Sequence, residues 1–336
     1  MSILYHLATL RPAMPQAEAI SQEISVLQER FDSDVVYVNP NQQSPFHIPR
    51  FLFGFHKLGR IRSRETDVHL HHFYNPDPFP FPYLRALRRP VIYSVTCGVG
   101  DSRPQRAFFS SLAAVAVSDR RSLARLQSWG LENVVLVRPG IDTSRLTCSP
   151  LPLRSEIRLL VGSAPWTNNQ FRTKGVEALL SAAEQEPRLR LVFLWRGVLA
   201  DEMRHRVRRR NLEEQVTVLN RLVDVNRILA DVHGAITLAA SPGIVKSYPH
   251  SLLESLAAGK PVLVSRAIPM ADYVERNGCG VVIERVTPTD VLAGIHQFMT
   301  GYASLEETAR SAGGESFSQK MMIASFERLY EGVLKE

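Results

Sequence analysis

Short apolar runs alternate along the chain with longer stretches whose apolar residues recur at helical spacing. In the first half the apolar runs lie at residues 3–10, 35–38, 68–71, 91–95, 113–117 and 134–137, and the amphipathic stretches at 17–31 and 120–129. Buried strands that alternate with helices are typical of parallel sheets that helices cover on both faces. The pattern therefore predicts an α/β domain of the doubly wound type.

A second series of the same kind begins near residue 158. Its apolar runs lie at residues 158–161, 189–194, 216–219, 235–238, 262–264 and 281–283, and its helical stretches at 175–183 and 251–258. We predict two Rossmann-like domains, 1–146 and 156–316, joined by a proline-rich linker at 147–155. Since open parallel sheets bind ligands beyond the carboxyl ends of their strands, we expect a central cleft that both domains face. Helical spacing predicts a terminal helix at 317–336.

Composition narrows the class of protein. With 336 residues and 45% hydrophobic content, the chain can form two cores. Its cysteines, Cys97, Cys148 and Cys279, are widely spaced, so we expect neither a disulfide framework nor a structural zinc site. No secretory signal precedes the first strand, and no apolar run reaches the roughly 18 residues of a membrane span. These features predict a cytoplasmic protein.

The charge of the chain is basic and comes mainly from arginine. Basic residues number 40 against 33 acidic ones, a net charge of +7, and only six of the 40 are lysines. The arginine fork suits phosphate or carboxylate groups. Basic stretches at 57–64 and 204–210 are either solvated faces or surfaces that dock the protein peripherally on an anionic inner membrane face. Nucleic acid is not an expected partner, since no recognition motif accompanies them.

Two helix starts carry candidate chemistry. We expect Arg172 and Lys174 at the start of one helix, with Thr173 as its cap. The amino end of a helix carries partial positive charge, so cations there favour a bound anion. A turn-rich segment at 241–249 leads to the second helix start, where Lys246 adds a positive charge.

The second helix start leaves one question open. Ser251 and Glu254 fit the S-x-x-E capping box, in which the glutamate closes its own helix. On the residues alone, Glu254 is equally well a helix-capping residue or a ligand-binding residue.

These segments together resemble family 4 retaining glycosyltransferases of the GT-B fold. The similarity lies in Lys174-Gly175, in 246–261, in 115–142 and in 317–330, in the right order along the chain. It implies that the second domain binds a nucleoside diphosphate-sugar, expected to be a UDP-sugar. It also implies that the first domain binds a glycan, lipid-linked or small-molecule acceptor, and that the terminal helix packs back on that domain.

The resemblance further implies a hexosyl- or glycuronosyltransferase of polysaccharide biosynthesis that retains configuration and needs no metal or other cofactor. Lys174 matches the family's diphosphate-binding lysine, and Glu254 matches the second glutamate of the E-x7-E motif, which contacts the ribose. The expected donor-binding residues are Arg172, Lys174, Arg196, Tyr248, His250, Ser251, Leu252 and Glu254. The expected catalytic residues are Lys174, Lys246 and Glu254.

Two positions depart from the family pattern. Lys246 replaces the first motif glutamate, and Ser163 stands where an arginine usually follows the first glycine of this domain. One hypothesis is that Lys246, with Arg172 or Arg196, supplies the missing cation or pairs with the carboxylate of a uronic-acid donor. The alternative is a catalytically degenerate GT-B protein that acts as partner or scaffold of an active glycosyltransferase.

The first domain offers fewer candidates. His69, His71 and His72 follow a strand, but no carboxylate-rich loop accompanies them, so a metal site is not expected. They are either packed residues or residues that line the acceptor cleft. Thr96 stands where the family often has a histidine. We expect His71, His72 and Thr96 to face the acceptor.

Overall fold

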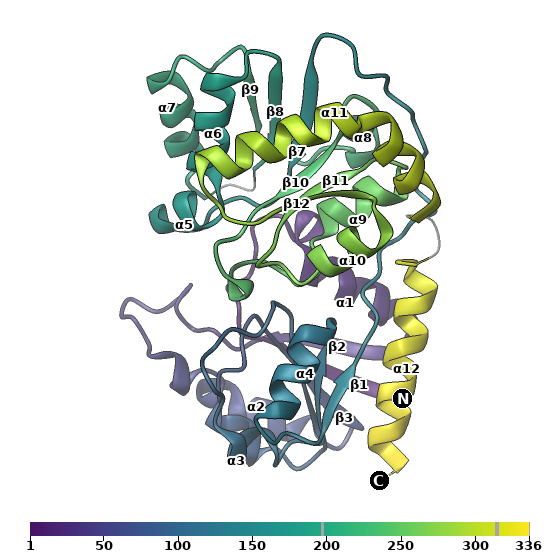
Figure 1. The fold of residues 1–336 in the computed structure, drawn as a ribbon. Helices are drawn as coiled ribbons and strands as arrows, with labels where there is room; N and C mark the ends of the chain where they lie inside the picture. Colours follow the sequence, from purple (N-terminus) through teal and green to yellow (C-terminus); the bar gives the residue numbers. More distant parts are fainter. Residues whose placement is uncertain (196–197, 313–315, 336) are drawn as a thin grey trace. The chain divides into compact units, whose positions relative to one another are not determined.

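The computed structural model describes residues 1–195, 198–312 and 316–335, and the chain divides into two compact units. Unit 1 comprises Met1–Pro139 and Lys320–Glu336, and unit 2 comprises Gly140–Gln319. Each unit contains a parallel six-stranded sheet covered by helices (Figure 1). The predicted fold class, α/β with two Rossmann-like sheets, is confirmed.

The sheet of unit 1 has the strand order β2-β1-β3-β4-β5-β6. Its strands are β1 (Ser2–Leu7), β2 (Asp32–Tyr37), β3 (Leu70–Asn75), β4 (Val91–Val95), β5 (Ala114–Val117) and β6 (Val134–Leu136). Its helices are α1 (Ala19–Arg30), α2 (Leu58–Ser63), α3 (Arg106–Phe109), α4 (Arg120–Ser128) and α12 (Gln319–Lys335). Alternate strand residues enter opposite cores: Leu4 packs in the core that includes α4, and Ile3 in the core that includes α1 and α12.

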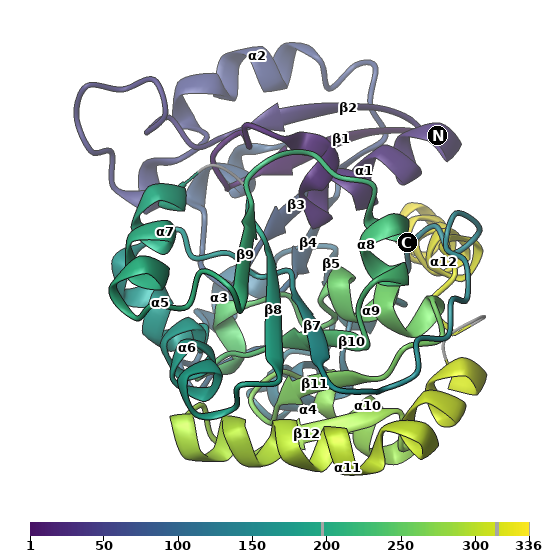
Figure 2. The same cartoon turned by 90° about the horizontal axis from the view of Figure 1, so that it is seen from above.

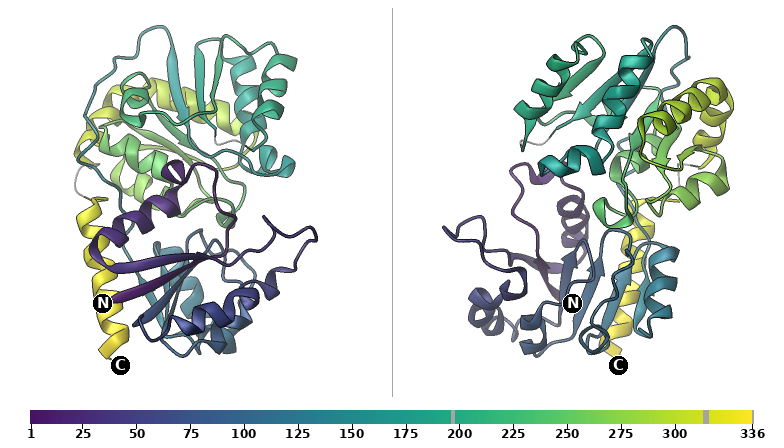
Figure 3. Two further views of the ribbon diagram at one scale, coloured as in Figure 1. Left: turned by 180° about the vertical axis from the view of Figure 1, so that it is seen from behind. Right: turned by 60° about the vertical axis from the view of Figure 1, so that its left-hand side comes forward.

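Helix α12 belongs to unit 1 although it ends the chain. Its residues Phe326, Leu329 and Tyr330 are buried in the same core as Tyr5 of β1 and Leu27 of α1. The hydroxyl groups of Tyr5 and Tyr330 lie 3.4 Å apart. Figure 3 shows α12 running beside α1 and the first strands of the sheet.

The sheet of unit 2 has the order β12-β11-β10-β7-β8-β9. Its strands are β7 (Ile157–Val161), β8 (Leu189–Leu194), β9 (Val216–Leu219), β10 (Gly234–Thr237), β11 (Val262–Ser265) and β12 (Gly280–Ile283). Its helices are α5 (Asn168–Thr173), α6 (Val176–Gln185), α7 (Ala200–Arg209), α8 (Val225–Ala230), α9 (His250–Ala257), α10 (Ala271–Asn277) and α11 (Pro288–Ala312). Leu159 packs in the core with α6 and α11, and Leu160 in the core with α8, α9 and α10. Figure 2 shows α11 lying along the sheet.

Strand order places the switch point of this sheet between β7 and β10. From β7 the chain adds β8 and β9 on one side, and from β10 it adds β11 and β12 on the other. In doubly wound sheets the loops that leave adjacent strands in opposite directions open a crevice at their carboxyl ends, where ligands bind.

Among the described residues, no helix is both long and apolar enough to cross a bilayer.

Candidate functional site

The turn between α5 and α6 lies near the switch point, at the carboxyl end of β10. Helix α5 ends at Thr173, Lys174 follows as its C-cap, and Gly175 has a φ of 70° before α6 begins. A Cβ atom on Gly175 would lie 2.6 Å from Leu238 Cδ1, so both backbone conformation and space require glycine. The backbone amide of Ala240, just after β10, donates to the carbonyl of Thr173 at 2.8 Å. The turn is therefore tied to the end of β10.

This geometry corrects the expected position of Arg172, Thr173 and Lys174. They end a helix instead of starting one, and Thr173 does not cap α6, whose N-cap is Gly175. Arg172 is exposed in the last turn of α5, where a cation interacts favourably with the helix dipole. Its position therefore gives no evidence for a bound anion.

Lys174 lies in a different environment. Its side chain is nearly buried, with 8% of the residue exposed, and its Nζ donates to the carbonyl of Ala164 at 2.9 Å. Ala164 belongs to the loop that follows β7. Burial of an ammonium group is costly unless partners offset the lost hydration. Lys174 thus holds a positive charge against the carboxyl ends of β7 and β10.

The amino end of α9 meets the same edge of the sheet. A Cβ atom on Gly162, directly after β7, would lie 2.5 Å from the Cβ of Ser251, so only glycine permits this approach. The hydroxyl groups of Thr237, at the end of β10, and Ser251 lie 3.4 Å apart. The N-cap of α9 is Pro249, which supplies no side-chain hydrogen bond to the helix. The amino end of α9, with its partial positive charge, lies at this edge of the sheet.

Glu254 does not act in a capping box. Ser251 lies inside the first turn of α9 instead of at its N-cap. Glu254 is 6% exposed, and its Oε1 accepts a hydrogen bond from Arg145 Nη2 at 2.9 Å. This guanidinium offsets the burial of the carboxylate. No local pattern predicts the role of Arg145, since it lies 109 residues from Glu254 along the chain.

The segment before α9 holds Lys246 close to His250. Lys246 Nζ lies 3.2 Å from His250 Nε2. An ammonium group only donates, so this nitrogen of His250 is the acceptor and its ring is neutral with the proton on Nδ1. Tyr248 packs against Phe317, with ring centres 5.6 Å apart, and Leu252 is fully buried. Lys246 thus adds positive charge beside the amino end of α9.

The structure therefore brings Lys174, His250 and Ser251 to the edge where β7 and β10 end, with Glu254 one turn deeper in α9. An ammonium group and the amino end of a helix at one edge both favour phosphate groups. Ser163 also lies in the loop after β7. The prediction for Arg196 falls outside the described residues.

His71 and His72 lie in the interior of unit 1, which differs from the expected cleft position. Both are 0% exposed and belong to β3, which is buried along its whole length. His72 Nδ1 lies 2.8 Å from the Tyr330 hydroxyl, and its Nε2 lies 2.8 Å from that of Ser94. Burial lowers the pKa of His72 to about 3. Both rings are committed to protein partners, because strands in a sheet covered on two faces have no exposed side.

A chain of buried polar groups surrounds His71. Its Nε2 lies 3.2 Å from Glu65 Oε1, its Nδ1 3.0 Å from His6 Nε2, and His6 Nδ1 2.9 Å from the Tyr83 hydroxyl. Hydrogen bonds from the backbone amides of Arg88 and Arg89 and from the His71 ring lower the pKa of Glu65. Its carboxylate is therefore the acceptor of the hydrogen bond with His71. Each neutral ring then donates toward Glu65, and Tyr83 donates to His6. Burial lowers the pKa of His6 and His71.

Thr96 is also buried, and its hydroxyl donates to the carbonyl of Asn75 at 3.4 Å. Like the two histidines, it has a structural partner in unit 1. Among the described residues, no group of three or more His, Cys, Asp or Glu side chains could hold a metal ion.

The two basic stretches are largely engaged within the chain. Arg210 pairs with Glu184 and Glu177, and Arg206 lies 4.2 Å from the ring centre of Phe171 while it pairs with Glu177. In the other stretch, Lys57 Nζ donates to the Tyr37 carbonyl at 2.7 Å. The exposed feature there is aromatic: Phe46, Phe51 and Phe55 are 78%, 51% and 43% exposed.

Comparison with known proteins points to the same part of unit 2. Residues 167–313 match the family model of the group 1 glycosyl transferases. This segment contains Lys174, Lys246 and all of α9. The part of unit 2 that carries the candidate site is thus similar to this family. No curated protein matches the chain.

Solved structures resemble the chain over its whole length. A glycosyltransferase from Rickettsia africae has a TM-score of 0.73 at 12% identity, with 100% of this chain and 99% of that chain covered. Sucrose-phosphate synthase from Thermosynechococcus elongatus has a TM-score of 0.73 at 16% sequence identity, with 100% of both chains covered. HepE of Anabaena in complex with UDP has a TM-score of 0.71 at 14% identity, with 99% of this chain and 100% of that chain covered. At such identities the likeness shows a shared fold.

Proposed function

We propose that the protein transfers a sugar from a nucleoside diphosphate-sugar to an acceptor. One observation carries the proposal: Lys174 and the start of α9 both lie against the segment that follows β7, at the switch point between β7 and β10. This is where a doubly wound sheet binds ligands, and both groups favour phosphate. The family match over 167–313, which contains them, supports the same reading.

In the orientation that we propose for the donor, its diphosphate would lie between Lys174 and the first turn of α9, at His250, Ser251 and Leu252. Glu254 lies deeper in α9 and would accept hydrogen bonds from the ribose hydroxyl groups, while Arg145 fixes the carboxylate. UDP is the proposed nucleotide, supported by the complexes of Anabaena HepE with UDP and with UDP-glucose.

The chemistry follows from the charges. As the bond from the sugar to the diphosphate breaks, negative charge grows on the departing diphosphate oxygen. Lys174 and the amino end of α9 would stabilise this charge with little reorganisation, because the fold already holds both at the site. A metal is not required where these groups serve the phosphates. We propose retention of configuration, with the departing diphosphate accepting the proton of the acceptor hydroxyl.

Lys246 bears on the choice of donor sugar. Its ammonium group lies beside His250 at the amino end of α9, where a carboxylate on the sugar would pair with it. We propose a uronic-acid donor for this reason. Calorimetry with UDP-glucose and UDP-glucuronate tests it: wild type should prefer the glucuronate, and Lys246→Gln should lose the preference. Equal affinity of wild type for both donors contradicts the assignment.

The same lysine supports a second candidate function. A cation in place of an acidic motif residue is also expected in a degenerate chain that serves as partner of an active glycosyltransferase. A thermal-shift screen of nucleoside diphosphates and their sugars separates the two, because ligand binding raises apparent stability by mass action. Stabilisation by UDP together with release of UDP from a UDP-sugar supports the enzyme. Binding without turnover over a range of acceptors supports the partner.

Unit 1 has an exposed aromatic segment. Phe46, Phe51 and Phe55 are exposed near Arg60 in unit 1, and such aromatic side chains insert at membrane interfaces. We propose that this segment contacts an anionic membrane at its cytoplasmic face and gives access to a lipid-linked acceptor. Sedimentation with phosphatidylglycerol vesicles should decrease in the variant Phe51→Ser/Phe55→Ser. Equal sedimentation of the two proteins contradicts the proposal.

A further inference from the structure

The exposed large apolar side chains of unit 2 lie at one edge of its sheet. Among the described residues of this unit they are Trp166, Val198 and Leu222, and Trp166 is 45% exposed. They follow the carboxyl ends of β7, β8 and β9, which are neighbouring strands. Ligands of doubly wound sheets bind beyond these ends. Trp166 alone among the three has an aromatic ring, and it belongs to the loop after β7 that Lys174 contacts.

Hydrogen bonds tie the loop of Trp166 to Lys174. Nζ of Lys174 donates to the carbonyl of Ala164 at 2.9 Å. The amide of Trp166 donates to Oε1 of Gln170 at 2.7 Å, and the amide of Lys174 donates to the carbonyl of Gln170 at 2.9 Å. Pro165, between Ala164 and Trp166, fixes one further backbone torsion. The backbone position of Trp166 is thus coupled to that of Lys174.

Helix α5, which follows this loop, is anchored in the core of unit 2. Phe171 is buried, its ring centre lies 5.9 Å from that of Trp195, and the guanidinium of Arg206 lies 4.2 Å from the same ring centre. In contrast, no hydrogen bond or ring contact in the described part of the chain engages the indole of Trp166. A well-held loop therefore presents an exposed aromatic face. A preformed site of this kind loses less entropy when its ligand binds.

The proposed orientation of the donor brings its sugar ring near this indole. In that orientation the diphosphate lies at Lys174 and the ribose at Glu254 in α9, which follows β10, whereas Trp166 follows β7 across the switch point. Two residues of chain span at most about 7 Å, so Trp166 begins close to the carbonyl of Ala164 that holds Lys174. The group attached to the other end of the diphosphate is the sugar. The C–H face of a pyranose is apolar and packs on an aromatic ring, while its hydroxyl groups stay hydrated at the rim.

We infer that Trp166 is a specificity-determining residue of the donor site, on which one face of the transferred pyranose ring packs. The inference rests on the proposed function, because that function places the diphosphate at Lys174. It adds a contact to the ring itself, which neutral and acidic pyranoses share. The effect of Trp166 should therefore be the same for both kinds of donor.

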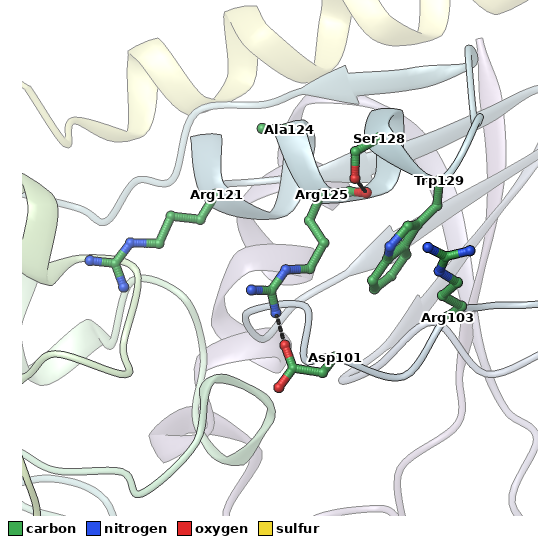
Figure 4. Close-up of a pocket in the computed structure, with 7 residues that line it drawn as sticks. All are labelled: Asp101, Arg103, Arg121, Ala124, Arg125, Ser128 and Trp129. Carbon is green, nitrogen blue, oxygen red and sulfur yellow. Dashed lines mark hydrogen bonds and ion pairs between the residues drawn. The ribbon is translucent and has the colours of Figure 1, made fainter.

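The test uses calorimetry with the whole protein and four probes: uridine, UDP, UDP-glucose and UDP-glucuronate. The variants are Trp166→Ala and Trp166→Phe, each checked for an unchanged melting temperature. The matched control is Trp129→Phe, which replaces a partly buried tryptophan of unit 1. Figure 4 shows Trp129 after the end of α4, where it lines a hollow of unit 1 together with Arg103. Intrinsic fluorescence is recorded in the same titrations.

We expect Trp166→Ala to bind both UDP-sugars about five- to tenfold more weakly than wild type, because it loses the apolar contact with the ring. Its affinity for uridine and for UDP should be unchanged. Trp166→Phe retains an aromatic face and should keep most of the affinity for the UDP-sugars. The fluorescence change that UDP-glucose causes beyond that of UDP should be present in Trp129→Phe and absent from Trp166→Phe.

Two results overturn the inference while the proposed function stands. One is equal affinity of wild type and Trp166→Ala for both UDP-sugars. The other is a loss in Trp166→Ala that is as large for uridine and UDP as for the UDP-sugars, which would place the base on the indole instead of the sugar. Absence of UDP binding by the wild type contradicts the proposed function and, with it, this inference.

Discussion

The buried histidines of unit 1 should make this unit sensitive to mild acid. Burial lowers the pKa of His6, His71 and His72 from the ordinary value of 6.5, and that of His72 to about 3. Above pH 6.5 these histidines are neutral in both the folded and the unfolded chain. Below it, the unfolded chain binds protons that the folded unit does not, so stability falls as the pH decreases.

The magnitude follows from the two histidines with the strongest shifts. At pH 5.5, one unit below the unfolded pKa, His6 and His72 together cost about 3 kcal/mol of unfolding free energy, and His71 adds in the same direction. Glu65 has a lowered pKa, so its contribution is lost only below its unfolded value of 4.5 and does not enter this window. For a unit of this size we expect the melting temperature to fall by about 6 to 12 °C.

Urea unfolding at pH 7.5, 6.5 and 5.5 measures this effect, with fluorescence fitted to two transitions because the chain has two units. Trp129 reports on unit 1, and Trp166 and Trp195 report on unit 2. The variant His72→Gln should be less stable at pH 7.5 but should lose less stability between pH 7.5 and 5.5 than wild type. A unit 1 transition with the same midpoint at pH 7.5 and 5.5 would refute the reasoning.

Three further changes test the unit 2 site. Gly162→Ala places a methyl group against Ser251 and should cost about 1–3 kcal/mol by overpacking and also weaken UDP binding, as measured by urea unfolding and calorimetry. Gly175→Ala, at φ 70°, should cost about 1–2 kcal/mol or more, whereas Gly59→Ala, with open space around it, should leave stability unchanged or raised. Equal stability of all three glycine variants would contradict these packing arguments. Arg145→Ala leaves the buried Glu254 carboxylate without its guanidinium, so UDP affinity should fall while that for pyrophosphate stays constant; a parallel loss for both ligands would argue against a ribose role.

Much of the fold follows from periodicity. The predicted strand runs at 91–95 and 189–194 coincide with β4 and β8, because buried parallel strands read as continuous apolar runs. The spacing of apolar residues predicts the terminal helix, which forms as α12. Helix α7 is not predicted, because its charged sequence has only a narrow apolar stripe through Met203 and Val207.

The local geometry of the candidate site could not be predicted from the sequence. The spacing around Lys174 predicts a helix start, yet the positive φ of Gly175 divides the segment into two helices and turns both cations to the end of the first. The S-x-x-E pattern at Ser251 fails as a cap because Pro249 already begins α9 and Gly162 admits Ser251 to the sheet edge. Such outcomes depend on contacts between distant segments, which local patterns do not encode.

The central claim is that unit 2 binds the diphosphate of a nucleotide-sugar through Lys174. It is tested most directly by calorimetric titration of UDP and of uridine into wild type, Lys174→Met and Lys320→Met, the last replacing an exposed lysine outside the site. Loss of a charge-assisted contact should weaken UDP binding by Lys174→Met about tenfold or more, with uridine binding unchanged and Lys320→Met equal to wild type. Equal UDP affinity in wild type and Lys174→Met, or no UDP binding by the wild type, would contradict the account.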